Sequence, residues 1–101
     1  MSLPVVELRE TVTIVNIKGL HARASAKFVN MVANLPEGID VRVIKDGMEA
    51  GGGSILGLMM LGAAKGDVID IAVSGATDAE GGAEPALAKL VGLIVDGFGE
   101  D

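Results

Sequence analysis

The apolar residues of this 101-residue chain switch repeatedly between the two-residue spacing of a strand and the spacing of a helix. Strands are predicted over residues 11–17, 39–45, 48–50 and 67–74. Helices are predicted from residue 22 to a stop at Pro36, over residues 55–61, and from the turn of Pro85 to a stop at Gly97. This β-α-β-β-α-β-α order favours an α+β fold, with one antiparallel sheet covered by helices on one face.

Length and composition favour one domain, residues 1–101, with one modest core. Half of the residues are hydrophobic, but Phe28 and Phe98 are the only aromatic ones, so the core must be mainly aliphatic. Residues 1–9 mix apolar and charged side chains around Pro4, and we expect them to form a loosely ordered leader.

Composition also excludes several kinds of protein. The chain has no cysteine, which removes disulfides, thiolate catalysis and cysteine metal sites and fits a reducing cytoplasm; no metal or cofactor is expected. No segment approaches the roughly 18 apolar residues of a membrane helix, and the N-terminus lacks a signal pattern. The net charge of −6 argues against nucleic acid or an anionic membrane as the main partner.

The only histidine, His21, stands between Gly19 and an alanine-rich helical run, two residues before Arg23. A helix N-terminus offers unpaired N–H groups and a partial positive charge, so it stabilises an anion without a metal. His21 could therefore carry a phosphoryl group as a nucleophile, while Arg23 holds the phosphoryl oxygens. The alternatives are a structural histidine and a solvated surface arginine.

The charge distribution singles out the same segment. Residues 11–36 contain Lys18, Arg23 and Lys27 but no acidic residue, although the chain as a whole is acidic. A local positive potential attracts phosphate, which favours a functional origin over a chance gap in a small protein.

Ser54 is well placed to cap the helix over residues 55–61. That helix is hydrophobic nearly all round, so we expect an exposed apolar patch of the kind that marks partner surfaces; the alternative is a more deeply buried helix. The preceding glycines, residues 51–53, lack the Lys and Ser/Thr pair of a nucleotide-binding loop and indicate a flexible loop instead.

The segment Gly19-Leu20-His21-Ala22-Arg23 resembles the active-site signature of the histidine-containing phosphocarrier protein (HPr) family, and residues 54–62 resemble its second signature. The ending, residues 97–101, is similar to the branch tied to nitrogen metabolism. One departure is Ala24, where many members have proline; we expect the helix to continue without loss of function, because alanine favours a helix. The resemblance implies an open-faced β-sandwich, a four-stranded antiparallel sheet with three helices on one face.

The resemblance also implies the route of the phosphoryl group. Enzyme I of the phosphotransferase system would phosphorylate His21 at Nδ1, with Arg23 stabilising the phosphate, and an enzyme IIA-type protein would accept the group. In some members a kinase, paired with a phosphorylase, acts on the serine that matches Ser54; a capping role alone is the alternative. The partner surface would contain Leu20, Ala22, Ile55, Leu56 and Met59. Members of the family are usually monomers.

Two other classes of function remain open. One is a regulatory binding module that uses Ser54 and the apolar helix over residues 54–61 without phosphoryl transfer. The other is an independent transferase or hydrolase, against which the lack of paired carboxylates near a nucleophile argues. A carrier whose partners supply the rest of the catalysis is the leading hypothesis. The sequence leaves open whether its route ends in sugar transport or in nitrogen or potassium regulation.

Overall fold

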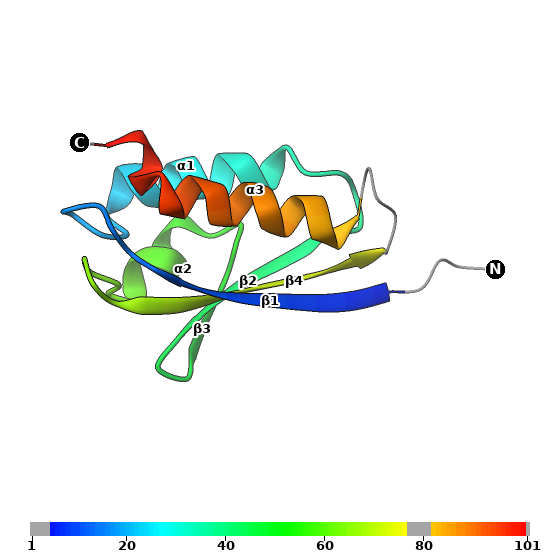
Figure 1. Cartoon of the computed structure of the whole chain (residues 1–101), viewed down its shortest axis with the longest axis horizontal. Helices are drawn as coiled ribbons and strands as arrows, with labels where there is room; N and C mark the ends of the chain where they lie inside the picture. The colour runs from blue at the N-terminus through cyan, green and yellow to red at the C-terminus, as the bar shows by residue number, and fades with distance from the viewer. Residues whose placement is uncertain (1–4, 77–81, 101) are drawn as a thin grey trace.

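The structure is a computed structural model that describes residues 5–76 and 82–100 as a four-stranded sheet with three α-helices (Figure 1). Its elements in chain order are β1 (Val5–Thr13), α1 (Ala22–Ala33), β2 (Asp40–Lys45), β3 (Met48–Gly51), α2 (Ile55–Met60), β4 (Val68–Ala76), α3 (Ala83–Val95) and the 3-10 turn η1 (Gly97–Gly99). The predicted order of strands and helices is therefore confirmed.

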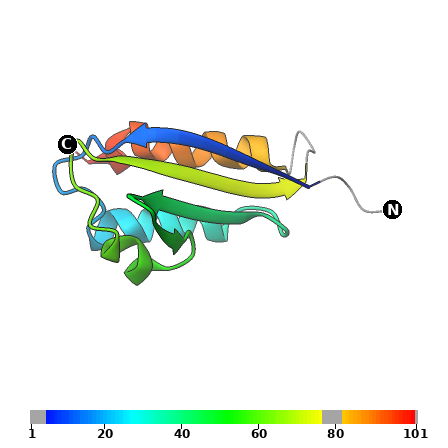
Figure 2. The ribbon, with the colours of Figure 1, turned by 90° about the horizontal axis from the view of Figure 1, so that it is seen from below.

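The strands lie in the order β1-β4-β2-β3, and every neighbouring pair is antiparallel. Helices α1 and α3 lie on the same face of the sheet (Figures 1 and 2), with α3 packed on β1 and β4, while α2 contacts α1 and β3. This arrangement is the predicted open-faced sandwich. None of the helices in the described ranges has the length and apolar character that crossing a bilayer requires.

Strand β4 is central, as its apolar sequence predicts, because it pairs with both β1 and β2. Ile69, Ile71 and Val73 alternate along it and are all buried beneath the helices. On neighbouring β2, Arg42 points away from buried Val41 and pairs with carboxylates of β1 and β3. The sheet thus has one apolar face and one charged face.

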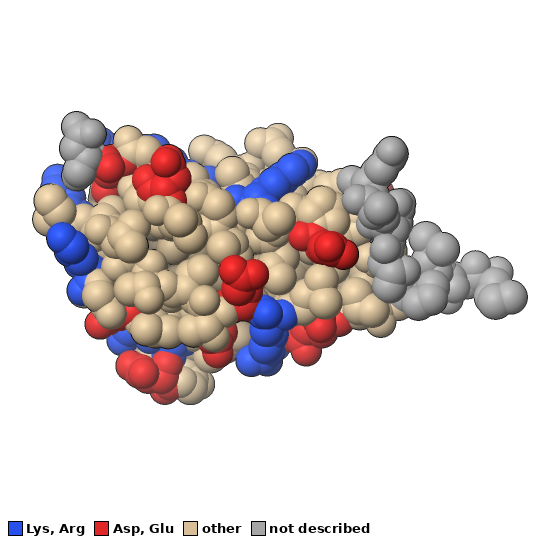
Figure 3. Space-filling model, viewed as in Figure 1, with Lys and Arg blue, Asp and Glu red and all other residues tan. Residues whose placement is uncertain are grey.

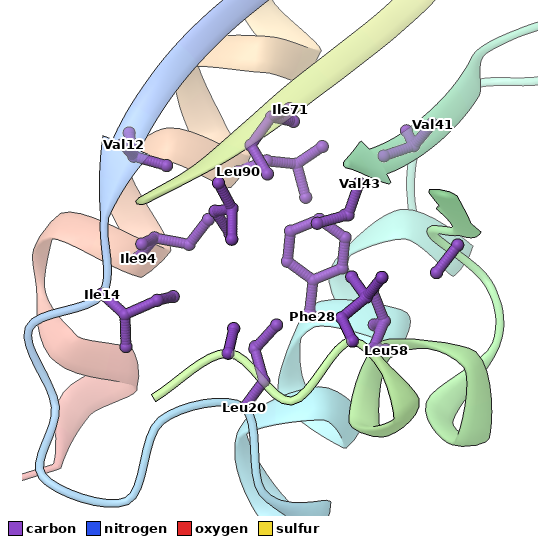
Figure 4. Close-up of a cluster of buried hydrophobic side chains, with 14 of the residues drawn as sticks. Val12, Ile14, Leu20, Phe28, Val41, Val43, Leu58, Ile71, Leu90 and Ile94 are labelled. Carbon is purple, nitrogen blue, oxygen red and sulfur yellow. The ribbon is translucent and has the colours of Figure 1, made fainter. Parts of the chain in front are cut away.

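The core is aliphatic except for the two phenylalanines, which are both buried. Figure 4 shows the ring of Phe28 of α1 next to the side chains of Val43 of β2 and Leu58 of α2. Burying one such large side chain stabilises the fold by roughly 1.5–3 kcal/mol. The core therefore fixes α1, and with it the segment that carries the histidine, against the sheet.

The boundaries of β1 correct two predictions. The strand starts at Val5 and ends at Thr13, so the expected loose leader is wrong for residues 5–9, while residues 1–4 lie outside the described ranges. Residues 14–17, predicted as strand, leave the sheet. Nine residues of β1 pair with β4, and because β4 begins at Val68, opposite Thr13, it offers residues 14–17 no strand residue to pair with.

Candidate functional site

His21 is the N-cap residue of α1, with extended backbone (φ −74°, ψ 180°). Its carbonyl accepts the first helical hydrogen bond from the Ser25 N–H at 2.9 Å, while its side chain makes no capping bond. No acidic residue lies in the first turn of α1. The N–H groups of residues 22–24 therefore lack side-chain caps and can bind an anion.

Gly19 sets the approach to this helix. It has a left-handed backbone (φ +62°), and a Cβ there would overlap the carbonyl oxygen of Ala63 and lie 2.8 Å from Cα of Ala64. The next residue, Leu20, donates its N–H to the same Ala63 carbonyl at 2.9 Å. Only glycine fits so close to the segment that follows α2. The contact therefore fixes the position of His21 relative to α2.

A carboxylate from the far end of the chain meets the histidine. His21 Nε2 lies 2.6 Å from Glu100 Oε2, and the two side chains are 25% and 17% exposed. The other oxygen, Oε1, accepts a hydrogen bond from Asn16 Nδ2 at 3.1 Å. Asn16 is buried and also donates to the Gly19 carbonyl at 2.8 Å. These bonds join the loop before α1, the histidine and the C-terminal segment.

The pKa of Glu100 reflects opposing influences. Burial is the largest single influence and raises the pKa, but hydrogen bonds from Asn16 and His21, together with electrostatic interactions with His21 and Lys27, outweigh it. The net result is a pKa below the ordinary value of 4.5. Glu100 is consequently a carboxylate at neutral pH.

The segment that delivers Glu100 is anchored on both sides. Phe98 is buried although its backbone is left-handed (φ +59°), which is a rare conformation for a bulky residue. Its carbonyl accepts a hydrogen bond from Lys27 Nζ of α1 at 2.6 Å. The core therefore holds the ring of Phe98 while α1 holds its backbone, and this places Glu100 beside His21.

A cavity of about 370 Å³ opens at this end of the molecule and is lined by Ile17, Lys18, His21, Arg23, Lys27, Gly99 and Glu100. In Figure 3, Lys and Arg atoms line the left-hand end of the molecule, beside a smaller group of Asp and Glu atoms, where α1 begins and the chain ends in Figure 1. The cavity brings the two predicted site residues, His21 and Arg23, together. The positively charged side chains in its lining, Lys18, Arg23 and Lys27, suit a phosphoryl group.

The predicted partner residues divide into exposed and buried ones. Ile55, Leu56 and Met59 are exposed on α2, with Leu56 68% accessible, whereas Leu58 between them is fully buried. The expected apolar patch is thus present, and Ala22 is also exposed. Leu20 corrects the prediction: only 5% of it is accessible, and its side chain points into the core (Figure 4), so it cannot form a partner surface.

Ser54 caps α2 as predicted. Its Oγ accepts a hydrogen bond from the Gly57 N–H at 2.9 Å, and the residue is exposed. In the first signature, Ala24 lies within α1 and is buried, so the helix continues through this position as expected.

Sequence reasoning missed Asn16, Ile17 and Glu100 as site residues. The two glycines that flank Phe98 near the end of the chain carried a usable signal, because such a pattern indicates a tight turn around a buried aromatic ring. Among the described residues, no three His, Asp or Glu side chains gather as a metal site would require.

Comparison with protein families finds one that matches most of the chain. The model described as PTS HPr component phosphorylation site matches residues 8–96. The phosphocarrier protein HPr of Neisseria meningitidis serogroup A is 43% identical over 93 residues, covering 92% of this chain and 97% of that protein. The phosphocarrier protein NPr of Escherichia coli K12 is 34% identical over 97 residues, covering 93% of this chain and 98% of that protein.

Solved structures have the same fold. The crystal structure of HPr-C-His from Thermoanaerobacter tengcongensis superposes with a TM-score of 0.76 at 34% identity, covering 93% of this chain and 98% of the other. The HPr of Bacillus anthracis superposes with the same TM-score of 0.76 at 30% identity, covering 87% and 96% of the two chains. This chain is therefore similar to these phosphocarrier proteins in both sequence and fold.

Proposed function

From the fact that this chain belongs to the HPr family of phosphocarriers of the phosphotransferase system, we propose that His21 is its phosphoryl acceptor. Phosphorylated enzyme I would supply the group, and an enzyme IIA-type protein would receive it. The observation that carries this proposal is the position of His21 at an uncapped helix N-terminus, in one cavity with Arg23.

The proposed reaction uses the histidine as a nucleophile. A ring nitrogen forms the bond to phosphorus while the bond from phosphorus to the donor breaks, and its electron pair stays with the donor. The free N–H groups of residues 22–24 bind the phosphoryl oxygens, and the Arg23 guanidinium neutralises their charge. The later transfer reverses these steps, so the chain needs no general base of its own.

The proposed partner surface combines the start of α1 with α2. Ala22 and Arg23 are exposed beside His21, and α2 contacts α1 while exposing Ile55, Leu56 and Met59. Methionine adapts to differently shaped partners, which suits a carrier that must bind a donor and an acceptor in turn. We propose that the chain acts in this way as a monomer in the cytoplasm.

Phosphorylation of Ser54 is the proposed means of regulation. The residue is exposed and stands at the N-terminus of α2, where a phosphate is electrostatically favourable. The added charge would lie next to Ile55 and Leu56 and would repel an acidic partner. A kinase would add the group and a phosphorylase would remove it. The similarity to NPr proteins supports a place in the nitrogen-related branch.

Intact mass after incubation with enzyme I and phosphoenolpyruvate tests the proposed acceptor. We expect one acid-labile phosphate on the wild type and none on His21→Ala, with Ser54→Ala as a matched control that still takes the group. If the wild type takes no phosphate while enzyme I charges another carrier, the proposal is wrong. If His21→Ala also regulates a target protein fully, the alternative of a binding module acting through Ser54 and residues 54–61 replaces it.

A further inference from the structure

We propose that Glu100 is a positioning residue that keeps a proton on Nε2 of His21 and so leaves Nδ1 as the nitrogen that takes the phosphoryl group. This inference rests on the proposed function and adds to it a residue that lies 79 positions away in the sequence. It depends on the 2.6 Å contact between His21 Nε2 and Glu100 Oε2 and on the segment that holds the contact in place.

The contact determines which ring nitrogen carries the proton. An ionised carboxylate can only accept a hydrogen bond, so Nε2 must be the donor. A neutral imidazole has one N–H, and its other nitrogen therefore keeps the lone pair. Nδ1 of His21 has no hydrogen-bond partner among the described residues, so its lone pair is free to attack phosphorus.

The same proton serves both directions of transfer. When Nδ1 bonds to phosphorus and the donor leaves with its electron pair, the ring retains its Nε2–H and becomes positively charged. The carboxylate of Glu100 compensates that charge. When the acceptor takes the group, the electron pair of the P–N bond returns to Nδ1 and a neutral imidazole leaves. No proton has to enter or leave the ring at any stage.

The anchoring of Glu100 distinguishes this contact from an ordinary surface ion pair, which contributes little. Its second oxygen is held by the buried side chain of Asn16, and the residue follows a turn fixed by the ring of Phe98 and by Lys27. The left-handed backbone of Phe98 is unfavourable and persists only because the surroundings impose it. Such strain is typical of a segment built to place a side chain.

Two measurements on Glu100→Gln test the proposal. Nitrogen-15 NMR of the neutral form of the His21 ring should show the Nε2–H tautomer in the wild type, and a larger share of the Nδ1–H tautomer in the variant, because an amide can donate as well as accept. Phosphorylation by charged enzyme I should become roughly ten- to hundredfold slower, by analogy with the loss caused by removing a carboxylate that orients a metal-binding histidine. The final amount of phosphate should not change.

Glu37→Gln is the matched control, because it removes one negative charge at an exposed position beyond the other end of α1. A chain truncated after Phe98 should reproduce Glu100→Gln, and circular dichroism would check that it folds. The inference is overturned if both variants keep the wild-type tautomer and rate. A wild type that takes no phosphate refutes the proposed function, and with it the transfer step argued here, whereas normal charging of both variants refutes this inference alone.

Discussion

Gly19→Ala should destabilise the fold far more than an alanine placed in a similar backbone conformation elsewhere. The substitution puts a side chain into a left-handed conformation, which costs roughly 1–2 kcal/mol. The new Cβ would also overlap the Ala63 carbonyl, so the loop must move away from backbone atoms that cannot yield as a flexible side chain would.

That movement has two further costs. It breaks the hydrogen bond from the Leu20 N–H to Ala63, a loss of about 1 kcal/mol. It also partly withdraws the buried Leu20 side chain, whose full burial stabilises by roughly 1.5–3 kcal/mol. The sum is about 3–5 kcal/mol, a large part of the roughly 5–15 kcal/mol typical of a small domain.

Gly62→Ala is the matched control. Gly62 has a similar backbone (φ +66°), but nothing lies within 4 Å of a Cβ built there. The free energy of unfolding of Gly62→Ala should therefore fall only by the conformational cost of about 1–2 kcal/mol. Urea unfolding of both variants and the wild type measures the difference, and each 1 kcal/mol should lower Tm by roughly 4–8 °C. Equal losses for the two variants would refute the role assigned to the contact with Ala63.

Three further predictions concern α2 and the C-terminal segment. Leu58→Ala should lower the free energy of unfolding by about 2–5 kcal/mol because Leu58 is fully buried, whereas Leu56→Ala at the exposed position should change it by less than roughly 0.5 kcal/mol in the same urea titration. Ser54→Ala should cost about 1 kcal/mol through the lost cap to the Gly57 N–H, and a thermal melt with no shift would contradict the capping role. Because the pKa of Glu100 is lowered in the folded state, its ionised form stabilises the fold above the ordinary value of 4.5, and this contribution disappears as the pH falls through the lowered value. Wild type should therefore exceed Glu100→Gln in stability at pH 7 but not at strongly acid pH, and a difference that persists in acid would contradict the stabilising role of the ionised Glu100 carboxylate.

Local features of the sequence predicted much of the fold. The apolar spacing predicted the helices and the two neighbouring strands β2 and β3, and Ser54 was correctly assigned as a cap. The start of α1 directly after His21 also followed from its neighbours. These features depend on residues within about one helical turn or one hairpin, which the sequence displays directly.

Only the tertiary structure decided the extent of β1, the burial of Leu20 and the contact of His21 with Glu100. Each depends on groups far apart in the chain: β4 extends β1 by pairing, the core takes in Leu20, and the buried ring of Phe98 brings Glu100 to α1. Local propensity does not reflect such contacts, because their energy comes from surfaces that meet only when the helices pack on the sheet. The sequence by itself therefore determined the order of elements and identified His21 as the candidate acceptor, while packing determined which carboxylate stands beside that histidine.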